Sequence, residues 1–267
     1  MTLAASWIDA FTDRPYGGNP AAVVRLEHAV ADRAMQDLAA EFALSETAFL
    51  LADGDAWHLR WFTPAREVNL CGHATLASAW FLTESGLAPA GRPIRFVTRS
   101  GPLGAQRTGD RIELDFPARP PQPIEPPPGL ADALGAWPIG CHAAGEDLLV
   151  ELASEAEVRR LAPDMDAIAR LAARGVIVTA QAAPPADFAS RFFAPRYGVP
   201  EDPVTGSAHC SLAPFWAARR GRNALVGVQH SRRGGEVRVR LEGERVWLGG
   251  RAVTIWRGEL AVDLGAA

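Results

Sequence analysis

The chain has 267 residues, of which 48% are hydrophobic, so it is long enough for two domains and can bury a sizeable core. Its formal net charge is −4 and it has no basic run, which argues against nucleic-acid binding. No apolar stretch reaches the roughly 18 residues of a membrane span, and the first residues lack the basic start and apolar core of a secretory signal.

Two features of the composition bound the chemistry and the compartment. The three cysteines are odd in number and far apart, which argues against a disulfide framework and favours a cytoplasmic protein. The chain contains no lysine, which excludes a pyridoxal Schiff base and a P-loop, and no GxGxxG motif follows a strand. We therefore expect no cofactor. The bias towards arginine, alanine, glycine and proline suggests a bacterial source.

Short apolar strands dominate the predicted secondary structure, with about one long helix in each half of the chain. The predicted helices cover residues 74–84, followed by Gly86 as a cap, and 208–219, followed by Gly221. Pro214 lies in the second turn of the later helix and can distort it. The predicted strands cover residues 21–26, 46–51, 57–62, 94–98, 111–116, 175–180, 189–193, 236–241 and 245–250.

The chain contains an internal repeat. The segment RWFTP from Arg60 matches RFFAP from Arg191, and the turn glycine Gly72 matches Gly206, with three extra residues in the second copy. In each copy a strand ends at a proline, a polar loop follows, and a glycine-centred turn opens a helix. A repeat of about half the chain length predicts a duplicated domain rather than a solenoid.

The proline-dense segment PARPPQPIEPPPG, from Pro117 to Gly129, falls between the two copies. Its composition predicts an extended linker, and a long surface loop within one domain is the alternative. We expect an N-terminal half at residues 1–118, a linker at 119–129 and a C-terminal half at 130–267, whose last strand is able to pack on the first half.

The two glycine turns are candidate binding sites. A helix N-terminus presents unsatisfied N–H groups, so Gly72-His73-Ala74 and Gly206-Ser207-Ala208 can each hold an anionic or carbonyl oxygen. If the halves pack about a pseudo-twofold axis, both turns face one cleft that suits a small carboxylic acid. The alternative is that each glycine only permits a turn from strand to helix.

Four motifs in this order resemble the phenazine-biosynthesis PhzF-like isomerase family: GGNPAAVV from Gly17, LSETAFL from Leu44, the CGHAT turn, and EDPVTGSA from Glu201. The resemblance covers nearly the whole chain. That family is related in fold to diaminopimelate epimerase. The resemblance implies an α/β (α+β) fold of two pseudo-symmetric halves, each a curved, mainly antiparallel sheet around a central helix. It also implies an active site between the halves and a homodimer.

Cys71 corresponds to the first of the two cysteines that work as a pair in the epimerase relatives. The matching position in the second half is Thr205, aligned through Gly206, and a hydroxyl is too weak an acid to replace a thiol. Cys210 lies inside the helix and does not fill this position. Two-thiol epimerisation is therefore not expected, and Cys71 is interpreted as a small, semi-buried residue.

The remaining candidates match the isomerase set. The resemblance implies Glu46 as the general acid/base, with His73 and Asp202 as its catalytic partners. The substrate-binding candidates are Ser207, Gly72, Ala74, Gly206 and Asn19. Judged from the residues alone, Glu46 is equally compatible with an outward-facing strand position, and Asp202 with a turn before Pro203.

The sequence therefore predicts a cofactor-independent isomerase that moves a proton within a small carboxylate-bearing substrate. By resemblance it is similar to trans-2,3-dihydro-3-hydroxyanthranilate isomerase. The alternatives are an amino-acid racemase or epimerase, and a non-catalytic module that binds a small molecule on the same fold. No metal is expected, because Cys141-His142 and His209-Cys210 lack zinc-type spacing.

Overall fold

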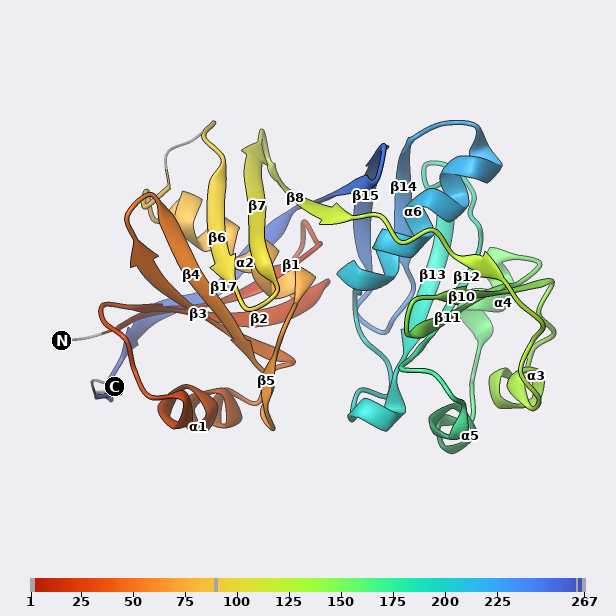
Figure 1. Cartoon of the computed structure of the whole chain (residues 1–267), viewed down its shortest axis with the longest axis horizontal. Coiled ribbons are helices and arrows are strands. Elements are labelled where there is room, and N and C mark those ends of the chain that lie inside the picture. Colours follow the sequence, from red (N-terminus) through yellow and green to blue (C-terminus); the bar gives the residue numbers. More distant parts are fainter. Residues whose placement is uncertain (1–2, 89–90, 263, 266–267) are drawn as a thin grey trace. The chain divides into compact units, whose positions relative to one another are not determined.

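The structure is a computed structural model that describes residues 3–88, 91–262 and 264–265. The chain divides into two compact units, which are described separately below. Unit 1 comprises Met1–Asp115 and Gly249–Ala267, and unit 2 comprises Phe116–Leu248. Strands and a few helices alternate along the chain, so the predicted α/β class is confirmed (Figure 1). No helix of the described residues is long and apolar enough to cross a membrane.

The unit boundaries differ from those expected from the sequence. Residues 249–267, expected in the C-terminal half with a last strand able to pack on the first half, belong to unit 1. There the last strand, β17 (Ala252–Leu260), pairs antiparallel with the first, β1 (Leu3–Ala10). Residues 119–129, expected as a linker, belong to unit 2. The chain therefore leaves unit 1 once, builds all of unit 2, and returns to finish unit 1.

A proline in the last helix explains why the proline-dense segment, Pro117 to Gly129, lies against unit 2. Helix α6 (Gly206–Arg220) contains Pro214, which has no N–H, so the carbonyl of Cys210 lacks its intrahelical partner. The N–H of Arg119 donates to that carbonyl at 2.9 Å. Farther on, the two-residue strand β9 (Gln122–Pro123) pairs with β10 (Gly140–Ala144). Backbone hydrogen bonds thus hold this segment against unit 2.

Unit 1 is one curved mixed sheet. Its strands follow the order β17, β1, β2, β3, β4, β6, β7, β8, and β5 also pairs with β4. The bounds of the remaining strands are β2 Asn19–Leu26, β3 Glu46–Asp53, β4 Ala56–Phe62, β5 Glu67–Val68, β6 Ile94–Thr98, β7 Gly101–Thr108 and β8 Arg111–Pro117.

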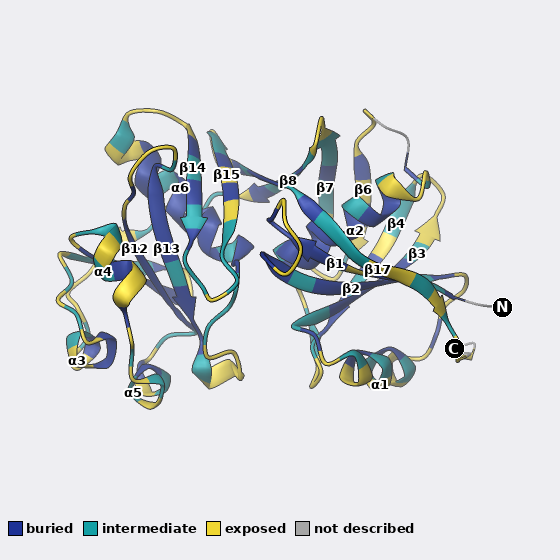
Figure 2. Ribbon diagram, turned by 180° about the vertical axis from the view of Figure 1, so that it is seen from behind, coloured by how far each residue is buried: buried dark blue, intermediate teal, exposed yellow. Residues whose placement is uncertain are grey.

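Helix α2 (Gly72–Glu84) is enclosed by the strands of unit 1, and most of it is buried (Figure 2). Its sequence is apolar or small on all sides, as expected of a helix without a solvent face. Its buried hydroxyls bond within the helix: Ser78 Oγ, for example, donates to the Ala74 carbonyl at 2.7 Å. Gly86, at φ +69°, ends the helix as predicted.

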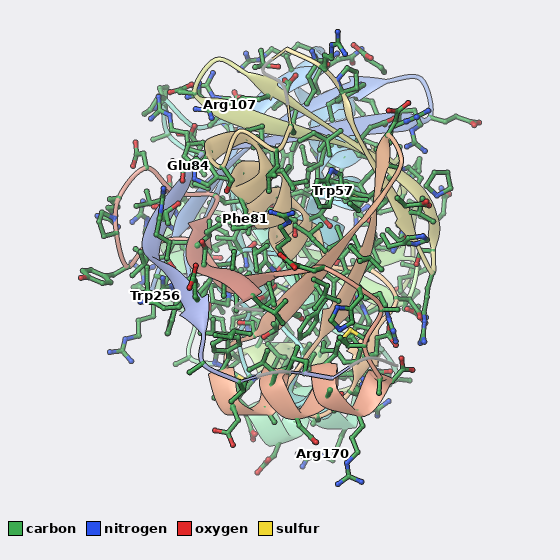
Figure 3. All side chains as sticks on the ribbon, turned by 90° about the vertical axis from the view of Figure 1, so that its left-hand side faces the viewer. Trp57, Phe81, Glu84, Arg107, Arg170 and Trp256 are labelled. Atoms are coloured by element: carbon green, nitrogen blue, oxygen red, sulfur yellow. The ribbon has the colours of Figure 1, made fainter. Side chains whose placement is uncertain are left out.

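A further helix, α1 (Asp32–Phe42), was not expected from the sequence. It lies outside the strands of unit 1 (Figure 1), and its buried Met35 and Ala39 pack with Val24 and Phe49 of the sheet. Figure 3 shows the side chains as sticks, with Phe81 and Glu84 of α2 and Trp256 of β17 labelled.

Unit 2 repeats this plan around α6. Its strands follow the order β9, β10, β11, β12, β13, β14, β15. The remaining elements are α3 Leu130–Leu134, β11 Asp147–Glu151, α4 Glu155–Arg160, α5 Met165–Arg170, β12 Val176–Gln181, β13 Phe188–Phe193, the 3-10 turn Pro195–Tyr197, β14 Ala224–Gln229, β15 Gly235–Glu242 and β16 Arg245–Gly250.

The two units share one pairing pattern. In each unit, antiparallel and parallel pairings alternate along six successive strands, beginning and ending with an antiparallel pair. These strands are β1, β2, β3, β4, β6 and β7 in unit 1, and β10 to β15 in unit 2. The repeat extends to side chains. Arg60 forms a two-pronged ion pair with Glu67, and Arg191 forms the same pair with Glu201. The duplication inferred from the sequence is thus present in the structure.

Candidate active site

The start of α2 positions His73. Cys71 precedes the helix in an extended conformation, and its carbonyl accepts both the Thr75 hydroxyl, at 2.6 Å, and the Thr75 N–H, at 3.1 Å. These two bonds hold the first turn of the helix. His73, the second helical residue, is buried. Its ring Nδ1 lies 3.5 Å from the Cys71 sulfur.

Glu46 lies against this turn. It is the first residue of β3, opposite Ala21 of β2, and its side chain is only 19% exposed. Its Oε2 lies 3.1 Å from Nε2 of His73. The outward-facing alternative for Glu46 is therefore wrong, because the carboxylate meets a buried imidazole.

The charges of this group follow from burial and from its neighbours. Burial alone would lower the pKa of His73, but the adjacent Cys71 sulfur and Glu46 carboxylate together raise that pKa well above 6.5. Burial, reinforced by Glu46, raises the pKa of the Cys71 thiol to about 11. Near neutral pH the sulfur therefore keeps its proton, and the His73 imidazolium donates through Nε2–H to the Glu46 carboxylate.

Asn19 lies beside the segment that carries Glu46. It is fully buried at the start of β2, and the hydroxyl of Ser45 donates to its Oδ1 at 3.4 Å. The preceding Gly18 has φ +61°, and a Cβ there would lie 2.0 Å from the carbonyl oxygen of Ala10. Only glycine fits this turn, which explains the GGN motif.

In unit 2, Asp202 is part of a hydrogen-bonded turn before α6. The Thr205 hydroxyl donates to Asp202 Oδ2 at 2.5 Å. The buried Gln229 donates to the Asp202 carbonyl at 2.8 Å, and its Oε1 accepts the Thr205 N–H at 3.0 Å. Asp202 therefore lies in a turn, as the alternative interpretation of the sequence proposed. The hydrogen bond from Thr205 also holds the Asp202 carboxylate in one direction.

Ser207, the second residue of α6, has a charged neighbour. Arg174 donates through Nη2 to the Ser207 hydroxyl oxygen at 3.2 Å, and through Nε to the buried Asp147 at 2.8 Å. A second bond to Asp147 makes that ion pair two-pronged, and the hydrogen bonds with Asp147 raise the pKa of Arg174 further. Because Ser207 accepts from the guanidinium, its own O–H remains a donor for a ligand.

Sequence reasoning missed Arg174, Asp147 and Gln229. The strand registers relate the first of them to unit 1. Phe62 pairs with Thr47 and its repeat mate Phe193 pairs with Val176, so Arg174 corresponds to Ser45, the residue before Glu46.

The candidate residues thus form two groups, one in each unit. Unit 1 brings Glu46, His73 and Cys71 together beside Gly72 and Ala74, and unit 2 brings Asp202 to Thr205, and Ser207 to Arg174. Thr205 precedes α6 as Cys71 precedes α2, which supports the alignment of these two positions. None of these residues lines the 370 Å³ cavity in unit 1, whose described lining includes Phe81, Glu84 and Arg257.

A family model described as "Phenazine biosynthesis-like protein" (PhzC-PhzF) matches residues 8–258. The chain belongs to the PhzF-like family. The resemblance inferred from the four sequence motifs is therefore confirmed, and the PhzF-like fold explains why the chain has two units of the same plan.

Relatives of this PhzF-like chain are similar over their full length. An uncharacterized isomerase of Pseudomonas aeruginosa is 51% identical, covering 98% of this chain and 100% of the relative. The human phenazine biosynthesis-like domain-containing protein is 38% identical, covering 97% and 99%. The crystal structure of a PhzF-family protein from Enterococcus faecalis is 40% identical, with a TM-score of 0.94, and covers 98% and 100%.

A more distant structure shares only the fold. A hydroxyproline epimerase from Agrobacterium vitis has a TM-score of 0.63 at 14% identity, covering 98% of this chain and 93% of its own. The fold is therefore that of PhzF-like and epimerase-like proteins, and the names of the bacterial relatives support an isomerase.

Proposed function

We propose that this PhzF-like protein is a cofactor-independent isomerase that moves a proton within a small carboxylate-bearing substrate. Glu46 is the group that carries the proton. The reaction resembles that of trans-2,3-dihydro-3-hydroxyanthranilate isomerase. The observation that supports this most directly is the 3.1 Å contact between the Glu46 carboxylate and the buried His73 ring.

The Glu46–His73 pair suits proton transfer at carbon. The imidazolium orients the carboxylate, so that Glu46 can accept a proton from a C–H bond. The electron pair of that bond enters the adjoining π system and the double bond shifts by one position. Glu46 then returns the proton to a second carbon. No oxidant, reductant or further reactant is needed.

Unit 2 supplies the groups to which we assign substrate binding. Ser207 and the N–H groups at the start of α6 suit a carboxylate, because the hydroxyl is left as a donor and the helix start is positive. Asp202 suits an amino or hydroxyl group of the substrate. In unit 1, Asn19, Gly72 and Ala74 are assigned to substrate binding.

The racemase alternative finds less support. A two-base racemase needs an acid in the second unit that corresponds to the first, and the counterpart of Cys71 is the hydroxyl of Thr205. The thiol of Cys71 itself stays protonated near neutral pH, since its pKa is about 11. A single carboxylate that both takes and returns the proton requires no partner of this kind.

Proton NMR in D₂O tests the proposal. The protein is incubated with dihydro-hydroxyanthranilate and with a panel of cyclic and amino-acid-like carboxylates. We expect a carbon-bound proton to exchange or migrate with the wild type and about 10²–10⁴ times more slowly with Glu46→Gln. The matched control is Glu41→Gln, which makes the same change at an exposed position of α1.

The same experiment separates catalysis from simple binding. A non-catalytic binding module would hold a ligand with similar affinity in the wild type and in Glu46→Gln, and would exchange no proton in either. Equal exchange rates in the wild type and in Glu46→Gln would rule out Glu46 as the proton carrier.

A further inference from the structure

Three side chains that can bind a metal ion, a carboxylate, a thiol and an imidazole, lie close together in unit 1. Glu46, Cys71 and His73 each offer one ligand atom, and these atoms all lie within 4.8 Å of one another. Nε2 of His73 is 4.0 Å from the Cys71 sulfur and 3.1 Å from Glu46 Oε2. The group escaped the sequence analysis because its glutamate comes from β3, whereas the other two residues come from the start of α2.

These distances can be compared with those of a tetrahedral zinc site. Zinc binds sulfur at about 2.3 Å and imidazole nitrogen at about 2.0–2.1 Å, which places neighbouring ligand atoms about 3.3–3.6 Å apart. The 3.1 Å separation of Nε2 and Glu46 Oε2 needs a change of only a few tenths of an ångström. The Cys71 sulfur needs a larger movement, because it lies 3.5 Å from Nδ1 of His73 and 4.0 Å from Nε2, and must swing to the Nε2 side. Its separation from the carboxylate oxygen, which is within 4.8 Å, must also close by up to about 1 Å. Side-chain rotations about Cys71 and Glu46 can supply such shifts without moving the backbone.

The ligand types also favour one class of ion. A thiolate and an imidazole prefer zinc and related transition metals to magnesium or calcium, which take oxygen ligands. A thiolate and a carboxylate together balance the charge of a divalent cation. At the start of α2, the Ala74 N–H donates to the Cys71 sulfur, which offsets a small part of the burial that raises the thiol pKa.

We propose that Glu46, Cys71 and His73 form a binding site for Zn²⁺. Binding breaks the S–H bond of Cys71 and releases that proton to solvent as the S–Zn bond forms. His73 also gives up the proton on Nε2, whose electron pair then binds the metal. Glu46 contributes one oxygen. It is the partly exposed member of the group, so the ion approaches from its side and a water molecule completes the four ligands.

Occupation of this site by Zn²⁺ inhibits the enzyme. A carboxylate bound to the metal cannot accept a proton from carbon, so zinc and substrate proton compete for Glu46. This consequence rests on the proposed function, whereas the binding of the metal does not. Zinc would act as an inhibitor that a chelator reverses, and it is no cofactor of the isomerisation.

Cobalt(II) is the probe, because it occupies zinc sites and absorbs light. The chelator-treated full-length protein is titrated with CoCl₂. We expect strong visible bands of a four-coordinate ion, a near-ultraviolet band from thiolate to cobalt, and displacement of both by ZnCl₂. In Cys71→Ser the near-ultraviolet band is lost and the affinity falls at least about 100-fold, because a direct ligand is removed. Cys141→Ser is the matched control, since Cys141 is also buried and free.

A second variant and a measurement of proton release complete the test of the zinc site. Should Cys71→Ser fail to fold, His73→Gln is used instead and should weaken cobalt binding to a similar extent. Wild-type protein should also release about two protons for each zinc ion bound, one from Cys71 and one from His73. A wild-type titration without a thiolate band, or a thiolate band of equal strength in Cys71→Ser, would overturn the site.

Failure of this site and failure of the proposed function give different results. If zinc binds as expected but saturated enzyme turns over at the full rate, the site stands and Glu46 is not the proton carrier. If cobalt shows no thiolate band while Glu46→Gln abolishes proton exchange, the metal site is wrong and the isomerase mechanism stands.

Discussion

The imidazole of His73 joins the carboxylate of Glu46 to the thiol of Cys71. Its Nε2 lies 3.1 Å from Glu46 Oε2 and its Nδ1 lies 3.5 Å from the Cys71 sulfur. Only one of the two neighbours can act as a base near neutral pH, because the thiol pKa is about 11. Under the proposed function, Glu46 therefore exchanges a proton, His73 orients the Glu46 carboxylate, and Cys71 packs beside them.

His73→Gln should lower kcat about 10- to 100-fold, because glutamine can donate a hydrogen bond to Glu46 but carries no charge. The loss should be smaller than that of Glu46→Gln. Steady-state turnover of the substrate found by NMR measures both variants. The control is His58→Gln, which removes a half-exposed histidine that pairs with Asp53. A wild-type kcat for His73→Gln would show that the imidazolium is not needed.

Cys71→Ala should keep turnover within about tenfold of the wild type, because a thiol that stays protonated is not the proton acceptor. The measurement is the same assay in the presence of a chelator. A loss as large as that of Glu46→Gln would indicate that the thiol takes part in the chemistry, and would revive the epimerase interpretation.

Arg174→Lys should raise KM for a carboxylate substrate about tenfold and leave kcat nearly unchanged. Lysine keeps the charge beside the buried Asp147, but it lacks the planar fork that reaches both Asp147 and Ser207. Arg219→Lys is the matched control, since Arg219 pairs with Glu151 in the same unit. An equal change of KM in both variants would assign the effect to general destabilisation.

His209 should make the protein less stable in acid. Burial lowers its pKa to about 4, against an ordinary value of 6.5, so the folded state resists protonation more than the unfolded state does. The resulting loss of stability is absent above pH 6.5 and grows as the pH falls towards 4. It reaches about 3 kcal/mol at lower pH.

His209→Asn removes this titration and keeps a donor for the Thr205 carbonyl, which Nδ1 of His209 contacts at 2.8 Å. Urea unfolding of both proteins at pH 7 and pH 4.5 measures the effect. We expect the wild type to lose more stability between the two pH values than His209→Asn does. Equal losses would show that other groups govern the acid sensitivity.

Much of the fold could be predicted from local sequence. The repeated strand, proline and glycine turn predicted a duplicated domain, and Gly86 and Gly221 do mark the helix ends. Local signals carry this information because strand periodicity, proline and positive-φ glycines act within a few residues. Helix α1 was missed. The helix is amphipathic, but it begins without a side-chain cap, and the left-handed residue that follows it is Ala43 rather than a glycine.

The sequence by itself determined the family and the identity of Glu46, His73, Asp202 and Ser207 as candidates, because these residues stand in contiguous motifs. Only the tertiary structure decided which partners they have. Strand registers bring Arg174 and Asp147 to Ser207, and the same kind of pairing turns Glu46 towards His73. The free carbonyl left by Pro214 docks the expected linker on unit 2. Such contacts join residues far apart in the chain, and no local pattern of residues encodes the register that brings them together.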